Sequence, residues 1–168
     1  VVDDTGSRIA SYDKIHVCNY GDCNETRFFT PGSKAVSFSY RGWKFGILIC
    51  ADMRYPILAQ RLVKDHGVDV LLQPACFARD VSFRTWKSFR ETRAVENGVY
   101  FLAGNYAGDN FGEASVVPPW VDEDHEPMVL DNRVGYLSAV LDRKVLQQAR
   151  TELPFYKHLC QTPCCDYQ

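Results

Sequence analysis

The stretch WKFGILICADMRYP, residues 43–56, contains the most hydrophobic run of the 168-residue chain and indicates how the chain folds. The part from Trp43 to Cys50 predicts a buried strand, because a short apolar run bounded by turn residues is typical of the interior of a sheet. Pro56 prevents a helix from beginning before the turn is complete. The pattern therefore predicts a strand, a polar turn and a helix, with the thiol of Cys50 at the tip of the strand.

A cysteine in this position has two interpretations. A thiol at a strand end is held in a fixed geometry, and the N-terminal amides of a following helix help to stabilise a thiolate. Cys50 would then be a nucleophile. The alternative is that Cys50 is one more buried core cysteine, which is the commoner fate of a cysteine in an apolar run.

The rest of the chain alternates predicted strands and helices. Apolar residues at helical spacing predict helices at 58–66, 82–96 and 141–150, the last one stopped by Pro154. Short apolar runs predict strands at 1–2, 8–17, 36–40, 43–49, 68–73, 99–104, 115–117, 128–130 and 135–141. Strands that alternate with helices predict an α/β fold in which helices cover a mixed sheet.

Length and composition indicate one domain, residues 1–159, followed by a Cys-rich tail at 160–168. A hydrophobic content of 46% and a charged content of 24% are ordinary for a globular protein. A net charge of −2 provides no attraction for nucleic acid or for an anionic membrane surface. No apolar run approaches the roughly 20 residues that span a bilayer. We therefore expect neither nucleic acid nor a membrane as a partner.

The seven cysteines favour free thiols over a disulfide framework. Their number is odd, and Cys50 and Cys76 lie in apolar settings, so we expect a reducing, cytoplasmic environment. Cys18 and Cys23, like the three cysteines of the tail, do not fit the paired Cys-x-x-Cys spacing of zinc sites. We therefore expect no metal and no other cofactor.

Six motifs along the chain resemble, in the same order, those of the nitrilase superfamily of carbon–nitrogen hydrolases. They are YDKIHV at 12–17, the Cys50 stretch itself, LQPACFA at 72–78, RAVENGVY at 93–100, GNYAG at 104–108 and GEASVVPPW at 112–120. In addition, Glu25 matches a second glutamate that the family has near its active site. Together the motifs cover roughly positions 1 to 159.

This resemblance implies a four-layer α-β-β-α sandwich with mixed sheets, of which the chain would supply the C-terminal part. The family uses a Glu-Lys-Cys triad, so Cys50 is expected to be the nucleophile and Lys14 the cation beside the developing oxyanion. Glu25 would hold Lys14 or orient water. The triad's own glutamate lies well upstream of the lysine in the family, whereas 13 residues precede Lys14 here. We therefore expect the N-terminal portion to be missing. Without the resemblance, Lys14 and Glu25 would be solvated surface residues.

The resemblance also implies the substrate class. A linear amide or an N-carbamoyl group would be hydrolysed to an acid and ammonia through a thioester on Cys50. Arg54 would hold a substrate carboxylate bidentately, and the alternative is a salt bridge to Asp52 or Asp69. Phe77 is expected to contact the substrate. Asn105 would bind the substrate from the pocket wall or, alternatively, cap a strand end.

Two further expectations concern the whole protein. In the resembled family, dimers form through helices that correspond here to residues 55–64 and 83–96, together with the C-terminal strand and tail, so a homodimer or a larger homo-oligomer is expected. The second functional hypothesis is a catalytically inactive fragment or homologue that acts as a binding or assembly module. The absence of the upstream glutamate supports this hypothesis, and the presence of Lys14 and Cys50 opposes it.

Overall fold

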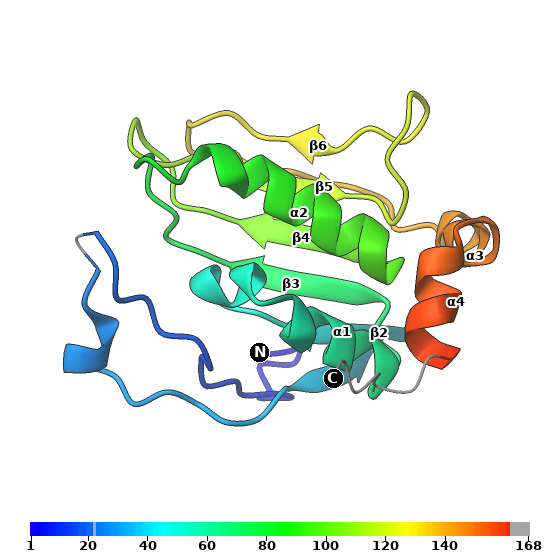
Figure 1. The fold of residues 1–168 in the computed structure, drawn as a ribbon, viewed down its shortest axis with the longest axis horizontal. Coiled ribbons are helices and arrows are strands. Elements are labelled where there is room, and N and C mark those ends of the chain that lie inside the picture. Colours follow the sequence, from blue (N-terminus) through cyan, green and yellow to red (C-terminus); the bar gives the residue numbers. More distant parts are fainter. Residues whose placement is uncertain (22, 162–168) are drawn as a thin grey trace, which may run out of the picture.

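The computed structural model describes residues 1–21 and 23–161, which form a six-stranded mixed sheet flanked by helices (Figure 1). The strands lie in the sheet in their sequence order. They are β1 (Ser37–Tyr40), β2 (Trp43–Ile47), β3 (Val70–Pro74), β4 (Tyr100–Gly104), β5 (Ser115–Val117) and β6 (Met128–Val129). The three strands β2, β3 and β4 are parallel, and the outer neighbours pair antiparallel. The predicted α/β class with a mixed sheet is confirmed.

The helices lie on both faces of this sheet. They are η1 (Glu25–Arg27), η2 (Cys50–Arg54), α1 (Pro56–Lys64), α2 (Arg84–Asn97), α3 (Arg143–Glu152) and α4 (Pro154–Gln161). In Figure 1, α1 and α2 cross the same face. Gly46 of β2 allows α1 to approach closely, because a Cβ atom there would lie 3.1 Å from the side chain of Leu62. Within the described residues, no helix is both long and apolar enough to cross a membrane.

Alternating residues of the central strands divide the core into two clusters. Leu71 and Phe101 face the helices α1 and α2 and are fully buried in the larger cluster. Their neighbours Val70 and Tyr100 point to the opposite face, where Leu146 of α3 packs on them. This alternation follows from the strand period of two residues. The sheet is therefore apolar on both faces, as expected of parallel strands.

The parallel strands bring three predicted functional segments to one edge of the sheet. Cys50 follows β2, Phe77 follows β3 and Asn105 follows β4. The carboxyl ends of neighbouring parallel strands lie side by side, and this edge of open α/β sheets is a common place for ligands. The N-terminal segment, drawn in blue, lies at the same end of the sheet as η2 (Figure 1).

The prediction of a strand at 8–17 is wrong. The only pairing of this segment among the described residues is an isolated bridge between Val2 and Arg8, and residues 9–17 form no helix or strand. The apolar residues of this segment pack individually; Ile15, for example, contacts the larger core cluster. The strand predicted to run to Ile49 also ends earlier, at Ile47, where the chain turns towards η2.

The strand predicted at 135–141 is also wrong: these residues form no strand, and Val134, Tyr136 and Val140 are at least 90% exposed. Helix α3 ends at Glu152, before Pro154, as predicted. The sequence analysis missed α4, which Pro154 begins because proline is well suited to the first position of a helix. The predicted Cys-rich tail overlaps the last turn of α4, and its residues 162–168 lie outside the described part of the chain.

Candidate active site

Cys50 lies in a sharp turn at the carboxyl end of β2, at the first position of η2. Its φ is 47°, in the left-handed region that non-glycine residues rarely adopt. Two side chains support this turn. Gln73 Nε2 donates a hydrogen bond to the Cys50 carbonyl at 3.1 Å, and Asp52 Oδ2 accepts one from Ile49 N at 2.9 Å. Such strained residues cluster at functional sites, where the surrounding structure holds them.

A cavity of about 630 Å³ opens beside Cys50. The N-terminal segment, the Cys50 turn and the loop after β3 line it. Five residues expected to be functional are among the lining residues: Lys14, Glu25, Cys50, Arg54 and Phe77. The volume suits a small molecule.

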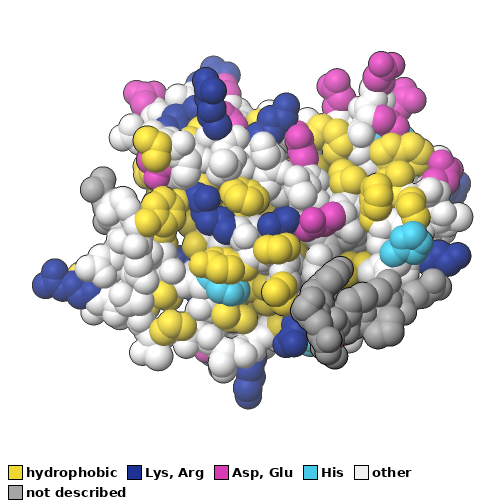
Figure 2. Space-filling model, viewed as in Figure 1, with side chains coloured by type: hydrophobic (Ala, Val, Ile, Leu, Met, Phe, Trp, Pro, Cys, Tyr) yellow, Lys and Arg dark blue, Asp and Glu magenta, His cyan; other side chains and the backbone are white. Residues whose placement is uncertain are grey.

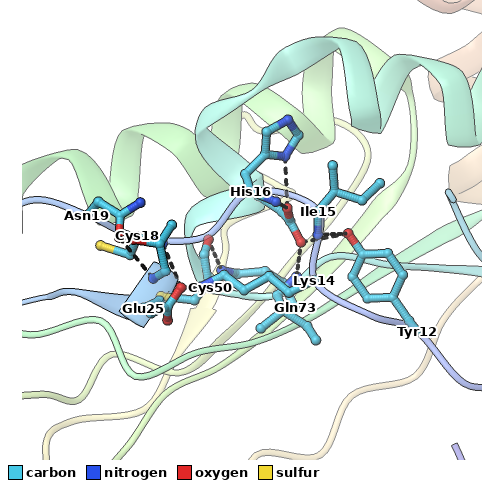
Figure 3. Close-up of polar contacts among 12 residues, drawn as sticks. Tyr12, Lys14, Ile15, His16, Cys18, Asn19, Glu25, Cys50 and Gln73 are labelled. Carbon is cyan, nitrogen blue, oxygen red and sulfur yellow. Dashed lines mark hydrogen bonds and ion pairs between the residues drawn. The ribbon is translucent and has the colours of Figure 1, made fainter. Parts of the chain in front are cut away.

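Lys14 and Glu25 form an ion pair within this cavity (Figure 3). The distance from Lys14 Nζ to Glu25 Oε2 is 2.5 Å, and the same oxygen accepts a hydrogen bond from Cys18 N at 2.6 Å. Burial alone would raise the pKa of Glu25, but the hydrogen bonds from Lys14 and Cys18 outweigh it and lower this pKa below its ordinary value. Glu25 is therefore a carboxylate that keeps the Lys14 ammonium in place.

Two opposing effects act on the pKa of the Cys50 thiol. Burial raises this pKa, and the charge of Lys14 lowers it but only partly offsets burial. The net pKa is raised above its ordinary value. The physical reason is that desolvation of the thiolate costs more free energy than the neighbouring ammonium returns.

Arg54 makes neither of the salt bridges considered as alternatives. Its Nη2 donates to Tyr20 Oη at 2.6 Å and to Ser82 Oγ at 3.0 Å, and its guanidinium lies 4.9 Å from the ring centroid of Phe77. Rings of Tyr20 and Phe89 lie at similar distances. Arg54 Nε is buried without a hydrogen-bond partner among the described residues. The cation is thus held among aromatic rings at the cavity, and no carboxylate of the described residues is among its hydrogen-bond partners.

Asn105 supports the cavity from behind its wall and is not among the lining residues. Its Oδ1 accepts from Phe77 N at 2.8 Å, and its Nδ2 donates to Phe77 O at 3.0 Å and to Gly112 O at 2.9 Å. The side-chain amide therefore fixes the loop that carries Phe77, whose side chain is 4% exposed.

Sequence reasoning missed four residues that build this site. Asp52, Tyr12 and His16 form a hydrogen-bonded group beside Lys14, and Gln73 holds the Cys50 carbonyl. The positions of Tyr12 and His16 on either side of Lys14 were visible, but the partner that Tyr12 and His16 share, Asp52, lies 36 to 40 residues away along the chain. Within residues 1–21 and 23–161, no cluster of three or more His, Cys, Asp or Glu side chains is arranged to hold a metal ion.

The mixed α/β fold, with a thiol, an ammonium and a carboxylate around one cavity, is the architecture of a candidate cysteine-dependent enzyme. The sequence model of the carbon–nitrogen hydrolases matches residues 1–150, and the chain belongs to this family.

Curated relatives of the chain are amidases. It is 29% identical over 170 residues to the deaminated glutathione amidase of Bos taurus, covering 94% of this chain and 51% of the relative. It is 27% identical over 163 residues to the omega-amidase NIT2 of Homo sapiens, covering 90% of this chain and 58% of the relative. The chain thus spans about half the length of the curated relatives it matches.

Solved structures agree with this assignment. Nit3 of Saccharomyces cerevisiae, a member of the nitrilase superfamily, is 26% identical with a TM-score of 0.77, covering 90% of this chain and 55% of that chain. A mutant amidase from Nesterenkonia sp. AN1, with acrylamide added at its active site cysteine, is 29% identical with a TM-score of 0.72. The match covers 90% of this chain and 59% of that chain. The predicted nitrilase-like fold is confirmed.

Proposed function

We propose that this chain supplies the nucleophile, the oxyanion-binding cation and one glutamate of an amidase. The substrate is a linear amide or an N-carbamoyl compound, and the products are a carboxylic or carbamic acid and ammonia. The observation that carries the proposal is that Lys14, Glu25 and Cys50 line one cavity of small-molecule size. The amidase relatives support an amide as the bond that is cleaved.

In the first proposed step, the Cys50 sulfur attacks the amide carbonyl carbon. The carbonyl oxygen gains negative charge, and the Lys14 ammonium stabilises it because a compact cation is effective beside a tetrahedral oxyanion. The C–N bond then breaks, the nitrogen takes up a proton and leaves as ammonia, and the acyl group remains on sulfur as a thioester. Water attacks this thioester in the second step and returns the thiol of Cys50 with release of the acid.

Both steps need a proton acceptor. Glu25 Oε2 already accepts hydrogen bonds from Lys14 and Cys18 N, so we assign Glu25 to holding Lys14 rather than to removing the Cys50 proton. No glutamate occurs among residues 1–13, although the family resemblance places the general base upstream of the lysine. We therefore propose that the 168-residue chain needs a further glutamate-bearing segment for turnover.

Arg54 and Phe77 are proposed to define the acyl side of the substrate. Within the part of the chain that the structure describes, the hydrogen bonds of the Arg54 guanidinium go to Tyr20 and Ser82 and not to a carboxylate. The guanidinium lies at the cavity, where it would pair with a carboxylate of the substrate. Phe77 provides an apolar wall beside it. Asn105 acts through Phe77, because its amide binds both backbone polar groups of that residue.

We further propose that the protein is a cytoplasmic homodimer. The described cysteines Cys18, Cys23, Cys50 and Cys76 are free thiols, which fits a reducing compartment. Hydrophobic side chains gather on the face that carries α1 and α2 (Figure 2). At the start of α1, Tyr55 and Ile57 are 46% and 66% exposed, as expected of residues that a partner covers.

The test combines turnover with detection of the thioester. The chain, alone and together with a glutamate-bearing N-terminal segment, is incubated with a simple aliphatic amide, a dicarboxylic acid monoamide and an N-carbamoyl amino acid. Ammonia is measured, and acylation of Cys50 is followed by mass spectrometry, with Cys50→Ala as the control. We expect ammonia release only from the combined protein and only with Cys50 present. Neither ammonia nor an acyl adduct in the combined protein would refute the amidase and favour the binding or assembly module.

A further inference from the structure

The segment that carries Lys14 has no regular structure to position it. Between residues 9 and 21 the chain forms no helix or strand. The proposed chemistry nevertheless requires the Lys14 ammonium to remain at a fixed place beside Cys50, because a displacement of about 1 Å in a catalytic group can cost roughly 100-fold in rate. Other contacts must therefore hold this segment against the sheet.

Asp52 supplies these contacts. Its side chain is fully buried, and both carboxylate oxygens are occupied by donors. Oδ1 accepts from His16 N at 2.9 Å and contacts His16 Nδ1 at 2.8 Å, and Oδ2 accepts from Tyr12 Oη at 2.7 Å and from Ile49 N at 2.9 Å. A buried carboxylate with this many donors is well satisfied, so it forms a rigid joint between the segments it binds.

This joint connects the two residues that flank Lys14 to the turn that carries Cys50. Tyr12 and His16 lie two residues before and two residues after Lys14, and Asp52 lies two residues after Cys50. Figure 3 shows Tyr12, Lys14 and His16 around this contact, with Cys50 and Glu25 beyond it. Tyr12 Oη also accepts from Ile15 N at 3.3 Å, and the His16 ring stacks on Tyr55 with centroids 3.7 Å apart.

We infer that Asp52 is a positioning residue, whose carboxylate ties the Lys14 segment to the Cys50 turn and thereby places the Lys14 ammonium relative to the Cys50 sulfur. The catalytic consequence of this role rests on the proposed function. The geometric part, which is the distance between ammonium and sulfur, does not depend on any substrate. Asp52 is not among the residues that line the cavity, so it acts through its neighbours.

The principal variant is Asp52→Asn. An asparagine retains one carbonyl oxygen, but its NH₂ group would face donors of Tyr12 and Ile49 or of His16, so part of the joint is lost. In the protein that turns over amide, we expect kcat to fall by about 10- to 100-fold with little change in KM. Tyr12→Phe removes one donor and keeps the ring, and a smaller effect in the same direction is expected.

The second readout is the alkylation of Cys50 by iodoacetamide as a function of pH, followed by mass spectrometry. Burial raises the pKa of Cys50, the charge of Lys14 lowers it, and Cys18 and Glu25 raise it further, while the charge of Cys50 in turn raises the pKa of Cys23. If Asp52→Asn lets Lys14 move away, the alkylation profile shifts to higher pH. A loss of general stability would not produce this shift.

Asp69→Asn is the matched control. Asp69 is also a poorly exposed carboxylate that joins distant segments, with Arg150 Nη1 at 3.0 Å and Lys44 N at 3.2 Å. It precedes β3 and therefore lies at the opposite end of the parallel strands from Cys50. We expect a lower melting temperature for this variant, with an unchanged alkylation profile of Cys50.

The two readouts separate the positioning role from the proposed function. A shifted profile in Asp52→Asn and Tyr12→Phe, without any amide hydrolysis by the wild-type protein, would support the positioning role and overturn the amidase. Amide hydrolysis with unchanged kcat and an unchanged profile in both variants would overturn the positioning role. An equal shift in Asp69→Asn would also overturn it, because the effect would then not depend on the contacts of Asp52.

Discussion

Replacing Glu25 by glutamine tests whether this carboxylate holds Lys14 in the N-terminal segment. Glu25→Gln keeps the size and shape of the side chain and removes its charge. The variant therefore weakens the contacts of Glu25 Oε2 with Lys14 Nζ and Cys18 N, which are 2.5 and 2.6 Å long. The Lys14 and Glu25 side chains are 14% and 29% exposed, so water replaces these contacts only in part.

The expected loss of stability follows from these two contacts. A hydrogen bond to a charged group contributes about 1.5–3 kcal/mol, and the glutamine oxygen can still accept one bond. We expect the free energy of unfolding to fall by about 1–2 kcal/mol, since part of the carboxylate is solvated. For a chain of this size, each kcal/mol corresponds to roughly 2–4 °C, so the melting temperature should fall by about 2–8 °C.

The effect should depend on pH in one direction. Burial raises the pKa of Glu25, but the hydrogen bonds from Lys14 and Cys18 outweigh it, so the pKa in the folded state lies below the reference value of 4.5. The stabilisation is therefore fully present above pH 4.5 and is lost as the pH falls through the folded pKa. Glutamine does not titrate, so the difference between wild type and variant should shrink in acid.

Thermal unfolding followed by circular dichroism, at neutral pH and in steps to about pH 3, measures this difference. Asp4→Asn is the control, because Asp4 forms an ion pair of similar length, 2.6 Å to Arg41, with side chains 58% and 72% exposed. This control should change the melting temperature little. Equal losses in both variants, or a Glu25→Gln difference that persists unchanged in acid, would refute the assigned role of Glu25.

Three further predictions address the thiol, the substrate and the assembly. Limiting iodoacetamide at neutral pH should label Cys50 before the other thiols, because Lys14 partly offsets the effect of burial on the Cys50 pKa, whereas burial and the neighbouring Cys18 and Glu25 all raise the pKa of Cys23, to about 11; peptide mapping that finds Cys23 labelled first would contradict this. Arg54→Met should reduce kcat/KM by roughly 10- to 100-fold for amides that carry a carboxylate, with little change for simple aliphatic amides; equal losses for both substrates would exclude carboxylate binding. Sedimentation of the protein at micromolar concentration should show a dimer. A monomer would contradict the dimer proposal, because no second subunit would then cover the apolar residues of α1 and α2.

The sheet and its helices could be predicted from the sequence because local patterns determine them. Three strands each carry their own signal of burial and turn residues. They are the run ending near Cys50, the apolar strand before Pro74 and the strand after Gly98. Gly98, for example, ends α2 with a φ of 56°, a conformation that glycine adopts without strain. Parallel pairing of these strands then follows from the helices that connect them.

The N-terminal half of the site could not be predicted in the same way. The apolar residues between 8 and 17 suggested a strand, but a strand needs a neighbour, and pairing is a property of the whole fold. This segment is held instead by single hydrogen bonds between side chains and backbone, such as those of Asp52 with Tyr12 and His16. Such contacts join residues far apart in sequence and leave no periodic pattern. The positive φ of Cys50 likewise has no signal in the residue type itself.

The raised pKa of Cys50 determines how the proposed reaction must work. Because burial outweighs the charge of Lys14, the pKa of the Cys50 thiol is raised, and the ammonium alone does not favour the thiolate. Attack on an amide must then be coupled to removal of the thiol proton by a base. Glu25 is engaged with Lys14 and Cys18 N, so we propose that the base is a separate carboxylate. In this scheme, Lys14 acts mainly on the developing oxyanion, which makes its position more important than its effect on the thiol. The hydrogen bonds of Asp52 with Tyr12 and His16, on either side of Lys14, hold Lys14 in this position.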